Sequence, residues 1–422
     1  MSDVVVVGGG AAGLMAAILA GRGGAAVTVL ESSRACGLKI LISGGGRCNL
    51  LPIASDEDDF FTTGSRNVLR RLFRTWRLEQ VVRFFEHDLE IPLLREEASG
   101  RLFPRSESAR AVRDRLVGAA REAGAEIHLG HRVTSVEPSN GGFLVHGQRD
   151  GRSQQVEARS VILAAGGQSL PKTGSDGSGF ELARGLGHSL TDRYPALVPL
   201  SSPDLALRAL SGVSVRVRWK TLASGKLLEE RERDLLFTHR GYSGPAILDA
   251  SHWAVRDGAQ LRVAWGGLQE EEWLRDLVAS SRKRIDELLG VVLPRRLVEL
   301  ILERAGIPGR TRFVQLHPKQ RRRLLPLLCA FDLPVDGNEG YRKAELTGGG
   351  VPLSEVNPST LESRCTPGLF VCGELFDAIG RMGGFNFLWA WVTGRLAGES
   401  AAARVRTSRD GSDPPLGRVA PP

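Results

Sequence analysis

Three glycines at a defined spacing follow a run of valines near the start of the chain. Gly8, Gly10 and Gly13 form a G-x-G-x-x-G pattern directly after residues 4–7. In a dinucleotide site the first glycine permits a tight turn, the second lets the backbone approach a pyrophosphate, and the third lets a helix pack closely on a strand. Glu31 ends the next predicted strand and can accept hydrogen bonds from both ribose hydroxyls. Because strand, turn, helix and acid occur in this order, we predict a dinucleotide-binding site and not a plain strand–helix turn.

A second glycine-rich stretch carries polar residues of a specific kind. Residues 43–49 read Ser-Gly-Gly-Gly-Arg-Cys-Asn, which suits neither a packed helix nor a strand interior. We expect a loop whose backbone lies against a flat ligand or its phosphates, with a flexible linker as the alternative. Arg47 is the candidate for binding an anionic substrate or a cofactor phosphate, and its charge could lower the pKa of Cys48. Plain packing of Cys48 against the ligand is the competing interpretation.

Two isolated residues in a strand–turn segment are candidate proton donors. These are His239 and Tyr242, and Cys48 is a third candidate. For isolated residues of this kind, a solvated or core role is the alternative to a catalytic one.

The elements around the glycine pattern predict an α/β fold. Buried strands are expected at 4–7, 27–30 and 160–163, with a small apolar helix at 11–20 between the first two. A three-stranded meander over 132–158 precedes the strand at 160–163, where a simple NAD-binding domain would have helices. Together these features favour an FAD-type, Rossmann-like parallel sheet.

Further helices are expected around this sheet. Helical periodicity covers 66–90, and a helix over 109–123 is expected to be capped by Ser106. Glu374 ends a late strand, and Gly383-Gly384 precede a long apolar helix. A glycine turn at a helix N-terminus offers a second position for an anion.

The chain is therefore expected to contain one discontinuous domain and one insertion. Residues 1–195 would form the first segment of an FAD-binding domain, with a helical excursion over 60–110. Residues 196–340 would form the inserted substrate or cap domain, part β-barrel-like and part helical. Residues 341–405 would complete the FAD-binding domain, and 406–422 would be a disordered tail.

Composition excludes several classes of protein. The chain has 422 residues, 42% of them hydrophobic and 25% charged, as in an ordinary globular protein. No run of about 18 apolar residues suggests a membrane span, and no basic segment precedes the first apolar run, so we expect no signal peptide. The five cysteines contain no C-x-x-C pair, which argues against disulfides and a zinc site and for the cytoplasm. The net charge of +8 invites a nucleic-acid interpretation, but the dense cluster at 310–323 is more typical of a solvated helix face.

The motifs taken together resemble the HI0933-like (YhiN/BaiN-type) flavoproteins, a family of NAD(P)/FAD-dependent oxidoreductases that also carries the name aminoacetone oxidase. The matching stretches include VVVVGGGAAGLMAA, KILISGGGRCN, VILAAGGQSLPKTGSDGSGFELARGLGH, LLFTHRGYSGPAIL, AELTGGGV and GLFVCGELFDAIGRMGGFNFLWAWVTGRLAG. The resemblance covers nearly the whole chain. It departs from the family pattern at Leu38, at Leu50-Leu51 and over 376–381, which concerns the substrate pocket and not the cofactor site.

The resemblance implies FAD bound by a two-dinucleotide-binding-domain (GR2-type) fold. The glycine pattern and Glu31 would bind the ADP half, Val133 the adenine, and Glu374 the pyrophosphate and ribityl end. The loop over 43–49 and the start of the last helix would approach the isoalloxazine. The implied cofactor contacts are Gly8, Gly10, Ala11, Ala12, Gly13, Glu31, Lys39, Ser43, Gly44, Gly45, Arg47, Cys48, Asn49, Val133, Ala165, Gly166, Gly373, Glu374, Gly384, Phe385 and Asn386.

The expected activity is hydride transfer through the flavin to or from a small organic substrate. NADPH or NADH would be the transient electron donor, bound over the flavin because the chain has no second G-x-G-x-x-G pattern. A flavin-dependent RNA-modifying or RNA-binding protein that uses residues 310–323 is the alternative. A non-catalytic flavin-binding scaffold is a third hypothesis.

Overall fold

The computed structural model describes residues 1–409, so most of the tail predicted over 406–422 lies outside the described residues. The chain divides into two compact units. The first contains residues 1–193 together with the chain from Leu346 onward, and the second contains Tyr194–Glu345. The boundaries expected from the sequence, 196 and 340, both fall inside the second unit.

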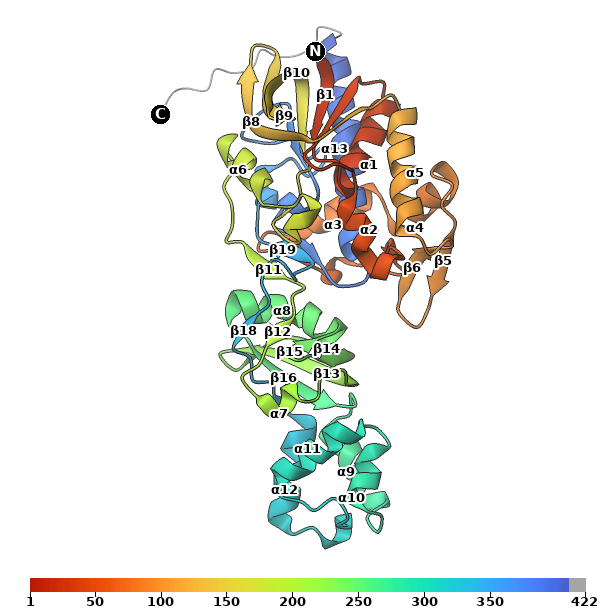
Figure 1. The fold of residues 1–422 in the computed structure, drawn as a ribbon, viewed down its shortest axis with the longest axis vertical. Coiled ribbons are helices and arrows are strands. Elements are labelled where there is room, and N and C mark those ends of the chain that lie inside the picture. The colour runs from red at the N-terminus through yellow and green to blue at the C-terminus, as the bar shows by residue number, and fades with distance from the viewer. Residues whose placement is uncertain (410–422) are drawn as a thin grey trace. The chain divides into compact units, whose positions relative to one another are not determined.

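The first unit is built on a mixed sheet with a parallel centre (Figure 1). Its order is β7-β2-β1-β10-β9-β8, and β20 also pairs with β10. The central strand β1 pairs in parallel with β2 and β10, and its valines are buried on both faces. The predicted α/β class with a parallel sheet is therefore confirmed. The strands are β1 (Ser2–Val7), β2 (Val27–Glu31), β7 (Glu126–Leu129), β8 (His131–Ser139), β9 (Gly142–Arg149), β10 (Arg152–Leu163) and β20 (Leu369–Val371).

Strand β10 joins two expected elements into one. Its first half pairs with β9 in antiparallel fashion and completes the predicted meander. Its second half pairs in parallel with β1 on one side and β20 on the other. The meander is thus an extension of the central sheet.

Helices and short strands surround this sheet. The helix α5 begins after Ser108, whose hydroxyl accepts the Ala111 N–H at 3.2 Å, so the predicted cap at Ser106 is wrong by two residues. The helices are α1 (Ala11–Arg22), α2 (Leu38–Ile42), α3 (Arg66–Thr75), α4 (Leu78–Arg83), α5 (Ala109–Glu122), α6 (Ser178–Gly185) and α13 (Phe385–Arg409). The short strands are β3 (Leu51–Pro52), β4 (Phe60–Phe61), β5 (Leu93–Glu96), β6 (Arg101–Pro104), β19 (Leu346–Gly348) and β21 (Ile379–Gly380).

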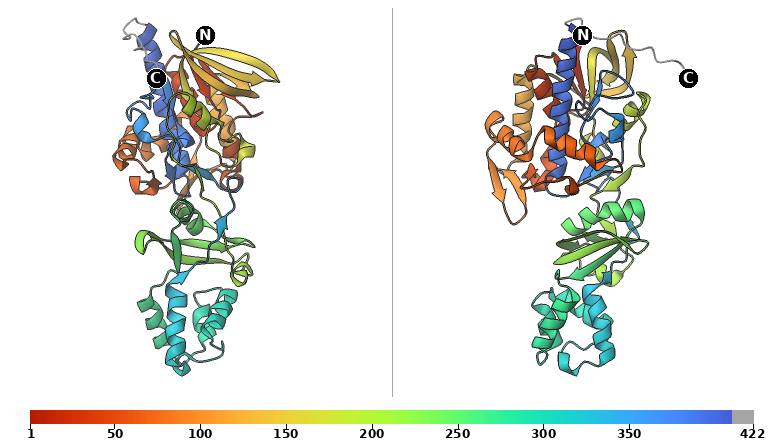
Figure 2. Two further views of the ribbon diagram at one scale, coloured as in Figure 1. Left: turned by 90° about the vertical axis from the view of Figure 1, so that its left-hand side faces the viewer. Right: turned by 180° about the vertical axis from the view of Figure 1, so that it is seen from behind.

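The long helix α13 packs directly against α1 (Figure 2). A Cβ at Gly394 would lie 2.4 Å from the Ala12 carbonyl oxygen, and one at Gly398 would lie 2.4 Å from that of Ala16. Only glycine allows this approach. The helix continues through Arg409, so residues 406–409 are helical where a disordered tail was expected.

The second unit combines an antiparallel sheet with a group of helices. The sheet order is β17-β16-β13-β14-β15-β12-β18, and its two edge strands are joined by residues 333–336 alone. A chain spans at most about 3.3–3.6 Å per residue, so this short connection keeps the two edge strands close together. The sheet therefore curls in a barrel-like way. The strands of this sheet are β12 (Leu200–Ser201), β13 (Ser214–Ala223), β14 (Lys226–Phe237), β15 (Gly241–Ser243), β16 (Gln260–Trp265), β17 (Phe331–Asp332) and β18 (Gly337–Asn338). The short strand β11 (Tyr194–Ala196) lies outside it. The helices are α7 (Leu205–Arg208), α8 (Pro245–Asp257), α9 (Glu270–Ala279), α10 (Ile285–Gly290), α11 (Arg295–Ala305) and α12 (Pro318–Cys329).

Each unit has its own hydrophobic core. The core of the first unit is formed by the valines of β1 and the apolar faces of α1, α5 and α13. The core of the second contains Trp219, Trp265 and Trp273 together with the leucines of α10–α12. Within residues 1–409, no helix combines the length and the apolarity that crossing a membrane requires.

Candidate functional site

The glycine turn between β1 and α1 has the close contacts that its spacing predicts. A Cβ at Gly13 would lie 1.9 Å from the Gly8 carbonyl oxygen. Gly8 has φ +103°, and a Cβ there would lie 2.5 Å from the Ala164 carbonyl oxygen. Helix, turn and the end of β10 are therefore packed so tightly that larger residues would displace the backbone.

Gly10, between these two crowded glycines, faces open space. A Cβ at Gly10 would meet no atom within 4 Å. Gly10 is the N-cap of α1, and within the described chain no side chain caps the helix there. The free N–H groups of Ala11 and Ala12 and the positive end of the helix dipole thus face an uncrowded position, which fits a pyrophosphate.

Glu31 is held rigidly at the end of β2. Its side chain is buried, and its two oxygens accept the N–H groups of Gly9 and Ser33, each at 2.7 Å. Oε1 also accepts the Ser32 hydroxyl at 3.4 Å, and Oε2 keeps a second lone pair for a hydroxyl donor. The neighbouring Cys36 is an ordinary buried thiol, since burial, with a smaller contribution from Glu31, raises its pKa to about 12.

The other expected nucleotide contacts lie along the same edge of the sheet. Val133 is buried in β8, and Ala165 and Gly166 directly follow β10, with Gly166 at φ +75°. A Cβ at Gly373 would lie 2.8 Å from the Cβ of Ala12, so the turn after β20 abuts the start of α1. The structure thus brings both segments of the discontinuous domain to one place.

Lys39 and Glu374 form an ion pair that was not predicted from the sequence. The Nζ of Lys39 in α2 lies 2.7 Å from Oε2 of Glu374, in the turn after β20. The other Glu374 oxygen accepts the Thr347 N–H at 3.0 Å. Thr347 was not predicted as a site residue, although it lies in the quoted stretch AELTGGGV; its hydroxyl accepts the Gln168 N–H at 2.6 Å.

The glycine-rich loop follows α2 as a compact, kinked turn. Ser43–Gly46 is a short 3-10 segment interrupted by Gly44 and Gly45, whose φ values of +56° and +67° are left-handed. Ser43 donates its hydroxyl hydrogen bond to the Ile40 carbonyl. Gly45 is exposed and has open space at its Cβ position, so its backbone is accessible to a ligand.

Arg47 is already committed to acidic partners. Its Nη2 lies 3.0 Å from Glu96 and 3.1 Å from Glu107, and its guanidinium lies 4.0 Å over the Phe103 ring. The charge is thus compensated within the unit, which weakens the interpretation of Arg47 as an anion-binding residue.

Cys48 is a buried thiol. It is fully buried, and burial raises its pKa to about 12. The expected lowering by Arg47 is therefore wrong, because the cost of desolvating a thiolate outweighs the charge of an arginine that is paired elsewhere. Next to it, the buried Oδ1 of Asn49 accepts no hydrogen bond from any described residue. That acceptor is available to a donor on a bound group.

The start of α13 is locked to the segment that follows the glycine-rich loop. Gly384 has φ +95°, and a Cβ there would lie 2.5 Å from the Leu51 carbonyl carbon. The Phe385 ring packs edge-on against Phe60. The side-chain amide of Asn386 accepts the Gly380 N–H and donates to the carbonyls of Gly380 and Arg381, so both of its N–H donors are used within the protein.

Of the two predicted proton donors in the second unit, one is buried in a hydrogen-bonded position and the other is exposed. Tyr242 is buried, its hydroxyl lies 2.9 Å from Ser202 Oγ and donates to the Pro334 carbonyl, and burial raises its pKa. His239 is exposed, and its backbone carbonyl accepts a hydrogen bond from Arg208.

The first unit has a parallel sheet that is extended by an antiparallel meander. Its first helix starts at glycine without a side-chain cap, and a buried acid lies beside that start. This is the architecture of FAD-dependent oxidoreductases, and this chain is one of them. The residues present fit the cofactor. A bound dinucleotide needs an open helix start, an acceptor for its ribose and further hydrogen-bond partners, and the open Gly10 position, the Glu31 carboxylate and the unsatisfied Asn49 oxygen provide these. The family model described as HI0933-like protein Rossmann domain matches residues 2–400, and the chain belongs to that family.

Two curated relatives span nearly the full chain. The 3-dehydro-bile acid delta(4,6)-reductase of Clostridium scindens is 34% identical and covers 96% of this chain and 100% of its own. The ribosomal RNA dihydrouridine synthase of Escherichia coli is 32% identical and covers 92% of this chain and 95% of its own.

Solved structures share the fold at low identity. The 3-ketosteroid-delta4-(5alpha)-dehydrogenase of Rhodococcus jostii RHA1 has a TM-score of 0.53 at 17% identity, covering 95% of this chain and 96% of its own. The 3-ketosteroid delta1-dehydrogenase of Sterolibacterium denitrificans has a TM-score of 0.51 at 16% identity, covering 96% and 99%. At these identities the likeness concerns the fold alone.

Proposed function

We propose that this FAD-dependent oxidoreductase takes electrons from NADPH or NADH and reduces a carbon–carbon double bond conjugated to a carbonyl in a small organic substrate. The observation that carries the proposal is the pair of full-length relatives. One is named for reducing double bonds of a 3-dehydro-bile acid, and the other for making dihydrouridine, which is uridine with one ring double bond reduced. Both names describe the same type of reduction on different substrates.

The chain's own residues supply binding and orientation in this reaction. Glu31 holds the ribose, and the N-terminus of α1 holds the pyrophosphate. The Lys39–Glu374 pair joins α2 to the turn after β20, and Asn49 offers a free acceptor oxygen at the end of the glycine-rich loop. FAD, when bound, supplies hydride transfer at its N5 atom.

Anaerobic titration of the purified flavoprotein with NADPH and then NADH tests the electron donor. Bleaching of the flavin band by either one supports the proposal, and unsaturated ketones can then be screened as acceptors. A band that persists with both donors would contradict the proposed linkage and direct attention to amines or hydroxy compounds as oxidase substrates.

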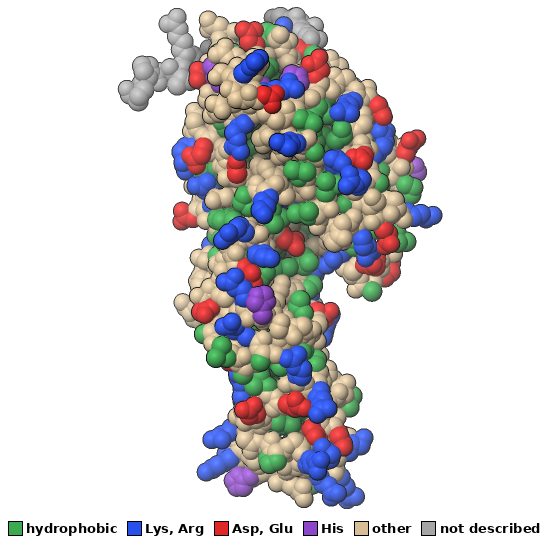
Figure 3. All heavy atoms as spheres, viewed as in Figure 1, with side chains coloured by type: hydrophobic (Ala, Val, Ile, Leu, Met, Phe, Trp, Pro, Cys, Tyr) green, Lys and Arg blue, Asp and Glu red, His purple; other side chains and the backbone are tan. Residues whose placement is uncertain are grey.

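A second candidate, reduction of a base in RNA, is favoured by the surface of the second unit. Figure 3 shows Lys and Arg side chains over its helical part. Two segments of this part, residues 281–285 and 310–323, carry exposed cations. Backbone hydrogen bonds between Ile285 and Thr311 and between Val314 and Ser281 join them. Within residues 281–285 and 310–323, the exposed cations that form no ion pair with a described residue are Arg282, Lys283, Arg310, Arg312, Lys319, Arg322 and Arg323.

Salt dependence of RNA binding tests this second candidate. Binding to RNA phosphates would weaken steeply as salt increases, and Arg322→Ala should reduce the salt slope by about one counterion. Arg295→Ala is the matched control, because Arg295 is equally exposed but paired with Glu299. Absent or salt-insensitive binding would dismiss the RNA hypothesis.

A further inference from the structure

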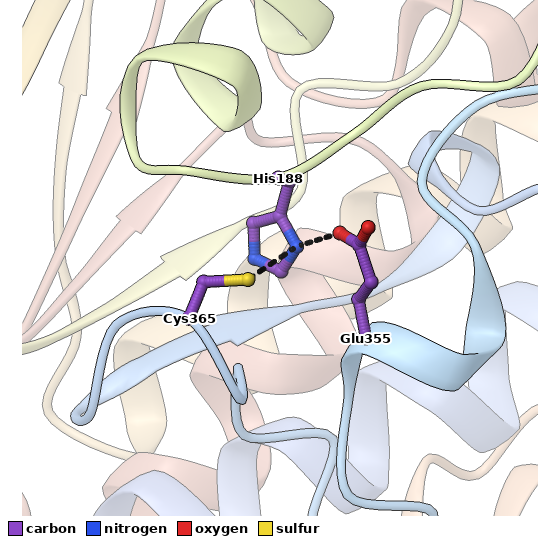
Figure 4. Close-up of side chains that lie close together, drawn as sticks. All are labelled: His188, Glu355 and Cys365. Atoms are coloured by element: carbon purple, nitrogen blue, oxygen red, sulfur yellow. Dashed lines mark hydrogen bonds and ion pairs between the residues drawn. The ribbon is translucent and has the colours of Figure 1, made fainter. Parts of the chain in front are cut away.

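Three side chains with metal-binding atoms meet in the first unit outside the residues assigned to the flavin (Figure 4). His188 follows α6, Glu355 ends a 3-10 turn over Leu353–Glu355, and Cys365 lies in the loop before β20. One ligand atom from each lies within 4.8 Å of the others. The Nδ1 of His188 is 2.8 Å from Glu355 Oε2 and 4.0 Å from Cys365 Sγ.

The geometry does not suit a catalytic relay. In a nucleophile–histidine–acid triad the nucleophile faces one ring nitrogen and the acid faces the other. Here Glu355 and Cys365 both face Nδ1 (Figure 4). The opposite nitrogen, Nε2, is buried and has no hydrogen-bond partner in the described part of the chain. The three ligand atoms instead lie close enough together to share one ion.

The donor set is that of a borderline transition metal. Thiolate, imidazole and carboxylate together suit Zn²⁺ and its spectroscopic substitute Co²⁺, and they do not suit Mg²⁺ or Ca²⁺. Zinc bonds of about 2.0–2.3 Å in a tetrahedron separate the ligand atoms by roughly 3.3–3.7 Å. The observed separations of 2.8 and 4.0 Å lie on either side of that range, so small side-chain movements suffice.

The three side chains are held in place before any ion arrives. The His188 ring is buried. The Glu355 carboxylate accepts the Ser189 N–H at 3.1 Å and also its hydroxyl. The Cys365 N–H donates to Ser363 Oγ at 3.1 Å. Supporting hydrogen bonds of this kind orient metal ligands and raise affinity.

We propose that His188, Glu355 and Cys365 form a binding site for a divalent transition metal ion of the zinc type. The ion takes the place of the hydrogen between Nδ1 and the carboxylate. That proton and the proton of the Cys365 thiol both pass to solvent as the metal–nitrogen and metal–sulfur bonds form, and the neutral imidazole carries its one proton on Nε2. A water molecule completes the four-coordinate shell. The ion joins His188 to the segment over residues 355–365, which is distant from it in sequence, and this role is independent of the flavin reaction.

The absence of a C-x-x-C pair, which argued against zinc, does not bear on this site. That spacing detects ligands that are close in sequence. His188 and Cys365 are 177 residues apart. Such a site is created by tertiary contacts alone.

Cobalt titration of the holoprotein tests the proposal. The flavoprotein is treated with a chelator, dialysed, and titrated anaerobically with Co²⁺ while ligand-field bands are recorded at wavelengths longer than the flavin absorption. We expect bands that saturate at one equivalent and disappear when Zn²⁺ is added. Failure of these bands to form would overturn the proposal, whatever the flavin activity.

Variants distinguish this site from adventitious binding. Cys365→Ser and Glu355→Gln should abolish the bands while leaving the flavin content unchanged, and Cys329→Ser, another free cysteine, is the control. Ser189→Ala removes only a supporting hydroxyl and should weaken metal binding roughly 10- to 100-fold. Bands that persist unchanged in both Cys365→Ser and Glu355→Gln would refute the assignment. If Cys365→Ser does not fold, Glu355→Gln and Ser189→Ala decide the question.

Discussion

The ammonium of Lys39 lies 2.7 Å from the carboxylate of Glu374, which is 335 residues further along the chain. The pair joins α2, in the first segment of the discontinuous unit, to the turn after β20 in the second. Both side chains are largely buried, and the Thr347 N–H holds the second oxygen of the carboxylate. The flavin site is thus held together across the position where the chain departs into the second unit.

Removing one member of this pair should be more harmful than removing both. Lys39→Met leaves a partly buried carboxylate without its cation, and Glu374→Gln leaves the ammonium without its anion, whereas the double variant leaves neither. We expect a coupling free energy of about 0.5–3 kcal/mol in a double-mutant cycle. Urea unfolding and FAD affinity are the two measurements. Additive single effects on both would show that the pair contributes nothing.

Loss of the Glu31 charge should weaken FAD binding without unfolding the protein. Glu31→Gln keeps one acceptor but loses charge-assisted hydrogen bonds worth about 1.5–3 kcal/mol, which corresponds to an increase in Kd of roughly 10- to 150-fold. Fluorescence of released FAD during dilution measures the change. The control is Glu79→Gln at an exposed glutamate of the same unit. Equal FAD retention in the two variants would show that Glu31 does not bind FAD.

A single methyl group between α1 and α13 should destabilise the first unit. In Gly394→Ala the new Cβ would lie 2.4 Å from the Ala12 carbonyl oxygen, and overpacking of this kind costs about 1–3 kcal/mol. Gly185→Ala at the end of α6 meets no atom within 4 Å and is the control. There we expect no change, or a stabilisation of up to about 1 kcal/mol, because alanine favours helix. Equal unfolding free energies for the two variants would contradict the close packing.

The second unit should lose stability in mild acid because of one histidine. Burial lowers the pKa of His252 from 6.5 to about 4, while its Nδ1 lies 2.9 Å from the Asp249 carbonyl oxygen. The unfolded chain therefore binds a proton more readily, and stability falls as the pH drops from 6.5 towards 4. The loss is on the order of 3 kcal/mol.

Hydrogen exchange in β13 and β16 as a function of pH measures this effect. His252→Asn keeps a donor near Nδ1 but does not titrate, so its exchange protection should vary less over the same pH range. His239→Asn, at an exposed histidine, should behave like the unaltered protein. A pH dependence that is identical in all three proteins would contradict the assignment to His252.

The sequence alone determined the features that depend on local pattern. The valines of β1, the crowded Gly8 and Gly13, the open Gly10 and the acid at the end of β2 follow from residue type and spacing, because the tight strand–turn–helix unit permits few alternatives. The family resemblance supplied the cofactor and the insertion. Among the secondary-structure expectations, sequence patterns failed at the ends of elements, as at the cap of α5 and at residues 406–409, which continue α13.

Only the tertiary structure decided which side chains meet. Arg47 is paired with Glu96 and Glu107, and the Asn386 amide is used by backbone groups, because segments distant in sequence pack beside them. The high pKa of Cys48 depends on burial, which the charge of its sequence neighbour did not reveal. Likewise, His188, Glu355 and Cys365 carry no common motif, and packing alone brings their ligand atoms together. Ion pairs, burial and shared ligand positions are properties of distance in space, and spacing along the chain does not encode them.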